Sequence, residues 1–358
     1  MKIAVYAISK NEEKFVERWV NSMSEADEIY VADTGSTDNT VELLKEKGVI
    51  VNSIKIEPWR FDTARNKSLE FVSKDIDICV CTDLDELFSK GWRKELEEKW
   101  TNGTTNARYN YIWSFDENGK PQMQFYIEKI HSRHNFKWIH PVHEVLLYTG
   151  TQEQKYVLLD NVTLKHFPDK TKSRGQYLPL LELSVKENPN DDRNMHYLGR
   201  EYMFYKMYDK SIETLKKHLV LPSAKWKDES CASMRYIAKC YIKKTDYSQA
   251  ELWYEKAVKE APYLREPYIE YAELEYELQN WNKVTELVEN ALKITERPMT
   301  YISEGYCWNY VPYDLLAIAY FNLVNYPLSL KNAVSAYLLE PENKRLKDNM
   351  QKIKEFIN

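Results

Sequence analysis

Two carboxylates that could bind a metal ion stand at the end of an apolar segment. Asp83 and Asp85 follow residues 76–82, whose composition is typical of a buried strand. Side chains alternate between the faces of a strand, so both carboxylates should point the same way. Carboxylate oxygens together with phosphate oxygens suit Mg²⁺ or Mn²⁺. The pair predicts a site for a divalent cation and a diphosphate, although solvated turns also carry such pairs.

A second acidic turn, Asp-Thr-Gly-Ser-Thr-Asp, occupies residues 33–38. Gly35 allows a tight bend, and Ser36 and Asp38 stand where a helix N-cap would be. A capped turn between strand and helix explains Ser36 and Asp38 but leaves Asp33 unexplained. A carboxylate at a strand end can accept hydrogen bonds from a nucleobase or a ribose hydroxyl. Asp33 is therefore a candidate nucleotide contact.

A cation stands near the start of the next predicted helix. Residues 61–66 read Phe-Asp-Thr-Ala-Arg-Asn, and either Asp62 or Thr63 could cap the helix. Arg65 in the first turn opposes the helix dipole. A nearby phosphate or base would resolve this conflict.

The elements around these motifs predict an α/β domain. Short apolar runs alternate with amphipathic segments, which is typical of a parallel sheet flanked by helices. Open sheets of this kind bind ligands at the carboxyl ends of their strands, where both acidic motifs fall. Residues 106–145 are aromatic and β-rich, and we expect them to complete the same domain. The predicted strands cover residues 3–8, 28–32, 49–56 and 76–82, and the predicted helices cover 12–23, 40–47 and 64–72.

From about residue 169 the pattern changes to helical spacing with an internal repeat. Small residues at Ala238 and Ala272 are 34 residues apart, the period of a tetratricopeptide repeat. Longer connections separate Gly199 from Ala238 and Ala272 from Ala317, by 39 and 45 residues. Residues 343–357 are expected to form a capping helix. The predicted domains are residues 1–168, α/β, and residues 169–358, all-α.

Composition narrows the functional classes. The 358 residues are 43% hydrophobic, without an apolar run near the roughly 20 residues that span a bilayer. The N-terminus leads directly into a strand, without a signal-peptide pattern. A net charge of −5 argues against general nucleic-acid binding. Five cysteines without a paired framework favour the cytoplasm.

The ordered motifs resemble the family 2 glycosyltransferases of GT-A fold. The resemblance rests on Asn-Glu-Glu at residues 11–13, the turn at 33–38, Ala-Arg-Asn at 64–66, Asp-Leu-Asp-Glu at 83–86 and Trp-Ile-His-Pro-Val-His-Glu at 138–144. With the repeat tail, it is similar to the bacterial subgroup of sublancin-type S-glycosyltransferases and lipopolysaccharide-core glycosyltransferases.

The resemblance implies a nucleotide-sugar site and a metal site. Asp33 would hold uracil or ribose, and Asp85 would ligate Mn²⁺ or Mg²⁺. Asp83 would contact ribose or metal. His166 would complete the metal shell, unless it simply packs at the domain boundary. The implied nucleotide-sugar-binding residues are Ser9, Asn11, Glu12, Asp33, Arg65, Asp83 and Leu84.

An inverting transfer also needs a base for the acceptor. Glu144 is our choice, with Glu86 and Asp116 as alternatives. Five of the seven histidines lie between residues 131 and 166, which favours a site there. Aromatic faces for a sugar could come from Trp59, Trp113 and Trp138.

The sequence thus predicts a metal-dependent inverting glycosyltransferase that uses UDP-glucose or UDP-N-acetylglucosamine. The acceptor would be a peptide, a protein or a glycan, and the repeats would bind it or a second copy of the chain. A repeat scaffold that binds a nucleotide sugar without turnover is the alternative. A nucleotidyltransferase would want a glycine-rich basic loop near the first strand, and Ser-Lys-Asn-Glu at residues 9–12 is not one.

Overall fold

The chain forms two compact units, which we describe separately. The computed structural model describes residues 1–169 and 171–357, so Lys170 and Asn358 of the predicted helical domain lie outside the described residues. The sheet unit is Met1–Glu187 and the helical unit is Asn188–Asn358. An α/β part followed by an all-α part confirms the predicted fold class. Helix α5, Tyr177–Glu187, belongs to the sheet unit, whereas the sequence placed a boundary at residue 168.

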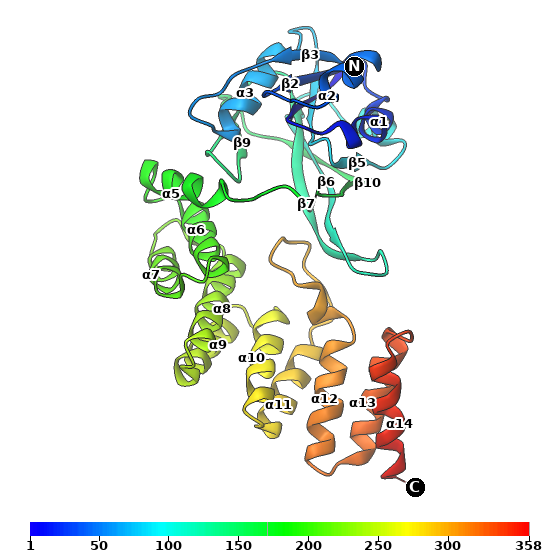
Figure 1. The fold of residues 1–358 in the computed structure, drawn as a ribbon, viewed down its shortest axis with the longest axis vertical. Helices are drawn as coiled ribbons and strands as arrows, with labels where there is room; N and C mark the ends of the chain where they lie inside the picture. The colour runs from blue at the N-terminus through cyan, green and yellow to red at the C-terminus, as the bar shows by residue number, and fades with distance from the viewer. Residues whose placement is uncertain (170, 358) are drawn as a thin grey trace. The chain divides into compact units, whose positions relative to one another are not determined.

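One mixed sheet of eight strands organises the sheet unit (Figure 1). Its order is β3-β2-β1-β4-β7-β6-β10-β5. The first four strands in this order are parallel, and β7 joins them antiparallel. The strands are β1 Ile3–Ser9, β2 Glu28–Asp33, β3 Ile50–Ser53, β4 Ile78–Cys81, β5 Glu86–Phe88, β6 Asn106–Phe115, β7 Pro121–Ser132 and β10 Tyr156–His166. A parallel core with antiparallel additions places the carboxyl ends of β1, β2 and β4 at one edge.

The helices of this unit bury one face each, as their spacing predicts. Helix α1 buries Phe15, Trp19 and Met23 at intervals of four residues. Sequence reasoning missed α4, β5 and β10. Besides α5, the helices are α1 Glu13–Met23, α2 Thr40–Glu46, α3 Phe61–Phe71 and α4 Trp92–Lys99.

Strand β10 brings the end of the unit back to the sheet. It pairs with β6 in parallel and with β5 antiparallel, so His166 stands opposite Glu86. A bulge shifts its register between Leu159 and Thr163. The aromatic segment at residues 106–145 forms β6 and β7 as expected, and its end forms a separate two-stranded sheet of β8 Phe136–Ile139 with β9 Val145–Tyr148.

The helical unit consists of helix pairs at the predicted spacing (Figure 1). Helices α9 and α11 begin at residues 247 and 281, which are 34 residues apart. The first and last pairs each contain the same kind of hydrogen bond. The Ser211 hydroxyl donates to the Gly199 carbonyl and the Ser329 hydroxyl donates to the Ala317 carbonyl, both at 2.7 Å. The helices are α6 Asp192–Phe204, α7 Tyr208–His218, α8 Lys227–Lys243, α9 Tyr247–Glu260, α10 Glu266–Glu277, α11 Trp281–Leu292, α12 Val311–Asn322, α13 Tyr326–Leu339 and the expected capping helix α14 Lys344–Glu355, with a short 3-10 helix at Gly305–Trp308.

Close helix packing explains the glycine in the first repeat. A Cβ at Gly199 would lie 2.5 Å from the side chain of Leu215 on α7. Later pairs accept alanine at the equivalent position, where Ala238, Ala272 and Ala317 are buried. The repeat register read from the sequence is therefore the packing register of the helices.

Candidate active site

Asp83 and Asp85 follow strand β4 in a turn that is stabilised by a buried side chain, Glu86. Glu86 is fully buried, and its carboxylate accepts the backbone N–H of Asp83 at 2.8 Å. It also accepts the Tyr111 hydroxyl at 2.7 Å and the ammonium group of Lys129 at 3.0 Å. Glu86, the alternative base of the sequence analysis, therefore supports the wall of the site and does not face an acceptor.

The carboxylate of Asp83 is turned toward two cations. It accepts from Arg65 Nη2 at 2.9 Å and from Lys129 Nζ at 3.4 Å. Burial raises the pKa of Asp83, but attraction to Arg65 and Lys129 outweighs this and holds the pKa below its usual range. Asp83 is thus ionised and already neutralised by protein groups.

The neighbour of Asp85 is different: it is the imidazole of His166, the last residue of β10. His166 Nε2 lies 3.4 Å from Asp85 Oδ2, and His166 Nδ1 donates to the Trp113 carbonyl at 3.0 Å. Burial lowers the pKa of His166, but the hydrogen bond and attraction to Asp85 raise it more. A carbonyl on Nδ1 leaves Nε2 free for a ligand, which is the usual arrangement of metal-binding histidines. The predicted neighbours Asp85 and His166 do lie together.

Arg65 connects the acids to the loop that precedes β9. Its Nε donates to Glu144 while its Nη2 donates to Asp83. Helix α3 begins at Phe61, with no side-chain cap among the described residues, so the predicted caps Asp62 and Thr63 were wrong. Arg65 lies in the second turn, and two carboxylates satisfy it where the sequence suggested a phosphate. The structure brings Glu144 and Asp83 to one guanidinium.

The loop that carries Glu144 has a strained backbone. His140 and His143 have φ of +76° and +51°. Residues other than glycine rarely adopt this conformation, and such strain often accompanies a working site. The Phe61 N–H donates to the Pro141 carbonyl at 2.9 Å, which fastens this loop to α3.

The turn at the end of β2 explains Asp33 fully. Its two oxygens accept the Ser9 hydroxyl, the Ser36 hydroxyl and two backbone N–H groups, those of Gly35 and Ser36. Gly35 has φ of +103°, which glycine adopts freely. Asn11 closes the same loop by accepting the Thr37 N–H at 2.7 Å. The turn uses Asp33 in its own folding, a role that the sequence pattern did not predict.

Glu12 and Leu84 differ in the groups with which they could contact a nucleotide-sugar donor. Burial raises the pKa of Glu12 to about 7, although its ion pair with Lys172 acts against this, and Asp85 and Asp83 add to the rise. Glu12 is therefore close enough to Asp83 and Asp85 to be affected by their charge. The Leu84 side chain is buried in the core, which leaves its main chain for a donor.

The histidines do not gather into one site. His131 is buried in the core, where it bonds to the Tyr6 hydroxyl at 2.8 Å. Trp138 is also buried and donates to the same hydroxyl, so it cannot present a face to a sugar. Trp113 is 38% exposed and its ring centroid lies 5.3 Å from that of His166. Trp113 is therefore the better aromatic candidate.

Comparison with known proteins identifies the sheet unit. The family model described as "Glycosyl transferase family 2" matches residues 5–148. This segment is a family 2 glycosyltransferase domain. An uncharacterized glycosyltransferase of Rickettsia bellii is 34% identical over 97 residues, covering 27% of this chain and 32% of that protein. Glycosyltransferase SunS of Bacillus phage SPbeta is 26% identical over 230 residues, covering 58% of this chain and 51% of SunS.

Two solved structures that are similar to the chain match its helical half. MamA is 17% identical with a TM-score of 0.39, covering 50% of this chain and 99% of that structure. The C-terminal part of a TPR repeat-containing protein from Cytophaga hutchinsonii is 16% identical with a TM-score of 0.42, covering 51% and 66%. Within residues 1–169 and 171–357, no helix is both long enough and apolar enough to cross a membrane.

The glycosyltransferase domain contains site residues that sequence reasoning missed. Lys129 neutralises Asp83 and Glu86 from the C-terminal half of β7, and Lys172 holds Glu12 from the segment after β10. A single lysine after Phe125, Tyr126 and Ile127 was the available signal for Lys129. No such signal marked Lys172.

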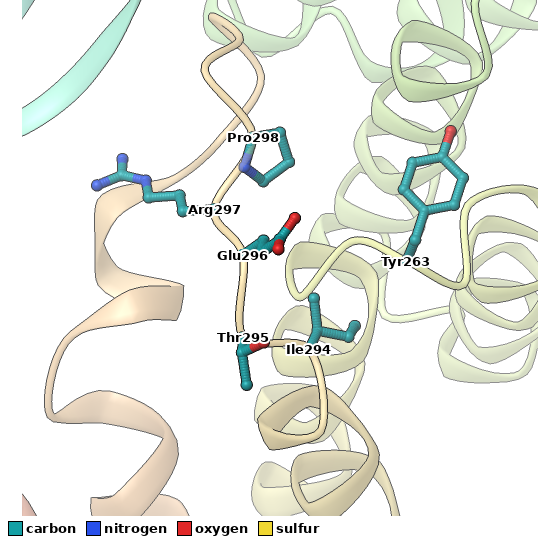
Figure 2. Close-up of a pocket in the computed structure, with 6 residues that line it drawn as sticks. All are labelled: Tyr263, Ile294, Thr295, Glu296, Arg297 and Pro298. Atoms are coloured by element: carbon teal, nitrogen blue, oxygen red, sulfur yellow. The ribbon is translucent and has the colours of Figure 1, made fainter.

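An open pocket of about 400 Å³ lies in the other unit and contains none of these groups (Figure 2). The side chains around it come from the connection after α11 and from the turn between α9 and α10. They offer no pair of acids for a metal and a diphosphate. Its lining residues are Tyr263, Ile294, Thr295, Glu296, Arg297 and Pro298.

Proposed function

We propose that this protein is a metal-dependent inverting glycosyltransferase that moves a hexose or N-acetylhexosamine from a UDP-sugar. The observation that carries the proposal is the placement of Asp85 beside His166, at 3.4 Å, in the turn after β4. This turn lies at the carboxyl edge of the parallel strands, where such sheets bind ligands. It also lies within the residues that match the family.

The donor would bind along the ends of β1, β2 and β4. Ser9 and Asn11 shape the loop around Asp33, and a uracil or ribose would exchange for some of the hydrogen bonds within that loop. Arg65 and Lys129 supply positive charge beside Asp83, toward the diphosphate. UDP-glucose and UDP-N-acetylglucosamine are the donors we propose.

The donor set at the acid turn fits a divalent cation. Asp85 would hold it, with His166 Nε2 as a second ligand, since Nδ1 is already committed to a carbonyl. Asp83 would share the metal only by leaving Arg65 and Lys129. A bound Mn²⁺ or Mg²⁺ supplies charge neutralisation for the leaving diphosphate.

Glu144 would act as the base toward the acceptor. The acceptor heteroatom attacks the anomeric carbon as the bond from that carbon to the diphosphate oxygen breaks. The acceptor proton passes to the Glu144 carboxylate, and UDP leaves with the bonding electron pair. Arg65, which now binds both Glu144 and Asp83, would orient the base.

The helical unit would recognise the acceptor, a peptide, protein or glycan, or pair two copies of the chain. Its helix pairs resemble arrays that use extended surfaces for binding. All five cysteines are unpaired, which supports a reducing compartment such as the cytoplasm.

A second candidate function has one observation in its favour. Asp83 and Glu144 both form ion pairs with Arg65, so both carboxylates are already occupied before a ligand binds. A scaffold that binds a nucleotide sugar without turnover would keep these pairs in the bound state.

One pair of variants tests the proposal. We expect UDP-sugars with Mn²⁺ or Mg²⁺ to raise the Tm of the full chain and to yield free UDP slowly by hydrolysis. Asp85→Asn should lose both effects. Asp160→Asn, the same change at an exposed pair with Lys99, should retain them. Binding without UDP release in the parent would favour the scaffold, and equal activity of Asp85→Asn would remove Asp85 from the site.

A further inference from the structure

Three side chains that can bind a metal converge in the first helices of the helical unit. Asp192 begins α6, His218 ends α7 and Glu229 lies in the first turn of α8. One ligand atom of each lies within 4.8 Å of the other two. Across residues 1–169 and 171–357, no other three His, Cys, Asp or Glu side chains meet so closely. The glycosyltransferase domain contributes none of them.

The imidazole of His218 points into this group with an unused nitrogen. His218 is fully buried, and its Nε2 has no hydrogen-bond partner among the described residues. Its nearest carboxylate oxygen, Glu229 Oε1, is 3.5 Å away, which is long for an N–H···O hydrogen bond. Buried polar atoms almost always have a partner. A ligand between His218 and Glu229 would supply one.

The neighbours of His218 favour the tautomer that binds a metal. Ser233 Oγ lies 3.0 Å from His218 Nδ1 and 2.7 Å from His196 Nδ1. A hydroxyl has a single proton, so Ser233 donates to one imidazole and accepts from the other. When His218 Nδ1–H donates to Ser233, its Nε2 lone pair faces the Glu229 carboxylate. A cation between the two makes that arrangement favourable.

The geometry agrees with a tetrahedral ion. Two ligands at about 2.0–2.1 Å from Zn²⁺ lie about 3.3 Å apart, close to the 3.5 Å between His218 Nε2 and Glu229 Oε1. The other Glu229 oxygen accepts the Tyr301 hydroxyl, so both of these ligands are held from behind. Asp192 is partly exposed and provides a path for the ion.

We propose that Asp192, His218 and Glu229 bind a divalent transition metal ion, with Zn²⁺ the best match, that clasps α6, α7 and α8 together. The imidazole ligand disfavours Mg²⁺ and Ca²⁺, which prefer oxygen. Three protein ligands leave a fourth position for water. This metal is separate from the donor-site cation, and its role is to hold the first helix pair against α8.

The test measures Zn²⁺ binding to the full chain by equilibrium dialysis after chelator treatment. The parent carries Asp85→Asn, so that the donor site does not contribute. We expect one Zn²⁺ per chain. Asp192→Asn and His218→Gln, each added to the parent, should weaken binding at least ~10-fold, because each removes a ligand. Glu213→Gln, an exposed change on α7, should not alter it.

Folding is followed by helical circular dichroism, and Zn²⁺ should raise the Tm of the parent but not that of Asp192→Asn. Asp192 is partly exposed, so this variant stays informative if His218→Gln fails to fold. A parent that binds no Zn²⁺, or binding equal in the parent and in Asp192→Asn, overturns the proposal. Neither result bears on UDP-sugar hydrolysis, since the proposed donor site lies in the sheet unit.

Discussion

The two units each bury an arginine, but they surround it differently. Arg65 in the sheet unit is 6% exposed, and its partner Asp83 is 33% exposed. Arg235 and its partner Glu270 in the helical unit are both 0% exposed. Glu270 is also held by Lys239 at 2.9 Å. In the open cluster around Arg65, the acid Asp83 is partly exposed and can exchange partners when a ligand arrives. In the cluster around Arg235, which we call sealed because the Arg235–Glu270 pair is fully buried, that pair can only fix the packing, although Lys239 is 33% exposed.

The helix starts show a second contrast. Among the described residues, α1 to α4 have no N-cap side-chain hydrogen bond. In the described part of the helical unit, α6, α9, α13 and α14 are capped by Asp191, Asp246, Asn325 and Asn343, whereas α7, α8, α10, α11 and α12 begin without such a bond. Packing against a sheet fixes the first group. The repeat helices have no sheet to fix their ends, and four of these nine depend on a local cap.

The largest effect should come from the open cluster. Glu144→Gln should cut glycosyl transfer by about 10²–10⁴, because an amide cannot take the acceptor proton. UDP binding should change little, since the amide oxygen can still accept from Arg65. Turnover with a UDP-sugar and affinity for UDP are the two measurements. Glu153→Gln, an exposed change before β10, is the control. A similar loss of turnover in this variant would mean that the effect does not come from removing a catalytic base.

The sealed cluster should respond in stability and not in donor chemistry. Arg235→Met should destabilise the helical unit by about 3–5 kcal/mol, because it leaves Glu270 buried without its main partner. Adding Glu270→Leu should recover most of this loss. Urea unfolding measures the stability, and UDP-sugar hydrolysis should stay normal in the double variant.

An exposed pair provides the reference for this series. Arg345→Met breaks a bidentate pair with Asp314 at the surface, and it should cost at most about 1 kcal/mol. Equal costs for Arg235→Met and Arg345→Met would abolish the distinction between the sealed and exposed pairs.

A buried histidine should make the sheet unit sensitive to acid. Burial lowers the pKa of His131 to about 4, with Arg133 adding to the effect. Its Nδ1–H donates to the Ser132 carbonyl, so its Nε2 accepts from Tyr6. The unfolded chain protonates near pH 6.5 and the folded unit only near pH 4. Stability is therefore present above this window and falls by about 3 kcal/mol as pH drops through it.

Substitution of His131 measures its contribution to the pH dependence of stability. His131→Gln keeps a neutral donor and acceptor, so the free energy of unfolding should depend less on pH between 6.5 and 4 than in the parent. The urea midpoint at several pH values is the measurement. Parallel curves for both proteins would assign the acid sensitivity to other groups.

A similarly small effect should come from a helix cap. Asp246→Ala removes the side chain that accepts the Gln249 N–H at the start of α9, and it should cost about 1 kcal/mol. Ser248→Ala, an exposed change two residues later, should stay within about 0.5 kcal/mol. Indistinguishable urea midpoints for the two variants would mean that the repeats do not rely on local capping.

Local patterns predicted the fold class and many of its elements. Short apolar runs located β1, β2 and β4, and small residues at Gly199, Ala238 and Ala272 located the helix crossings. Each of these signals comes from neighbours within one element or one repeat. Strand β10 and helix α4 escaped because their patterns are mixed, with exposed and buried residues in irregular order.

The site depended on contacts that no local pattern contains. Lys129 reaches Asp83 across 46 residues of sequence, and Arg65 reaches Glu144 across 79. These contacts follow from strand pairing, which the sequence did not specify. Chemical type alone also overvalued His131, whose polar ring is satisfied inside the core. Residue chemistry therefore suggested Asp85 and His166, while topology determined what surrounds them.

The bulge in β10 has a consequence for how this domain can vary. His166 meets Asp85 only because the shift between Leu159 and Thr163 sets the register of the strand end. A one-residue change in length that carried through to the strand end would exchange its two faces and turn His166 away. The residue types at positions 160 and 161 can therefore vary, but the number of residues between Leu159 and Thr163 cannot. Insertions and deletions here should be far rarer among active homologues than substitutions.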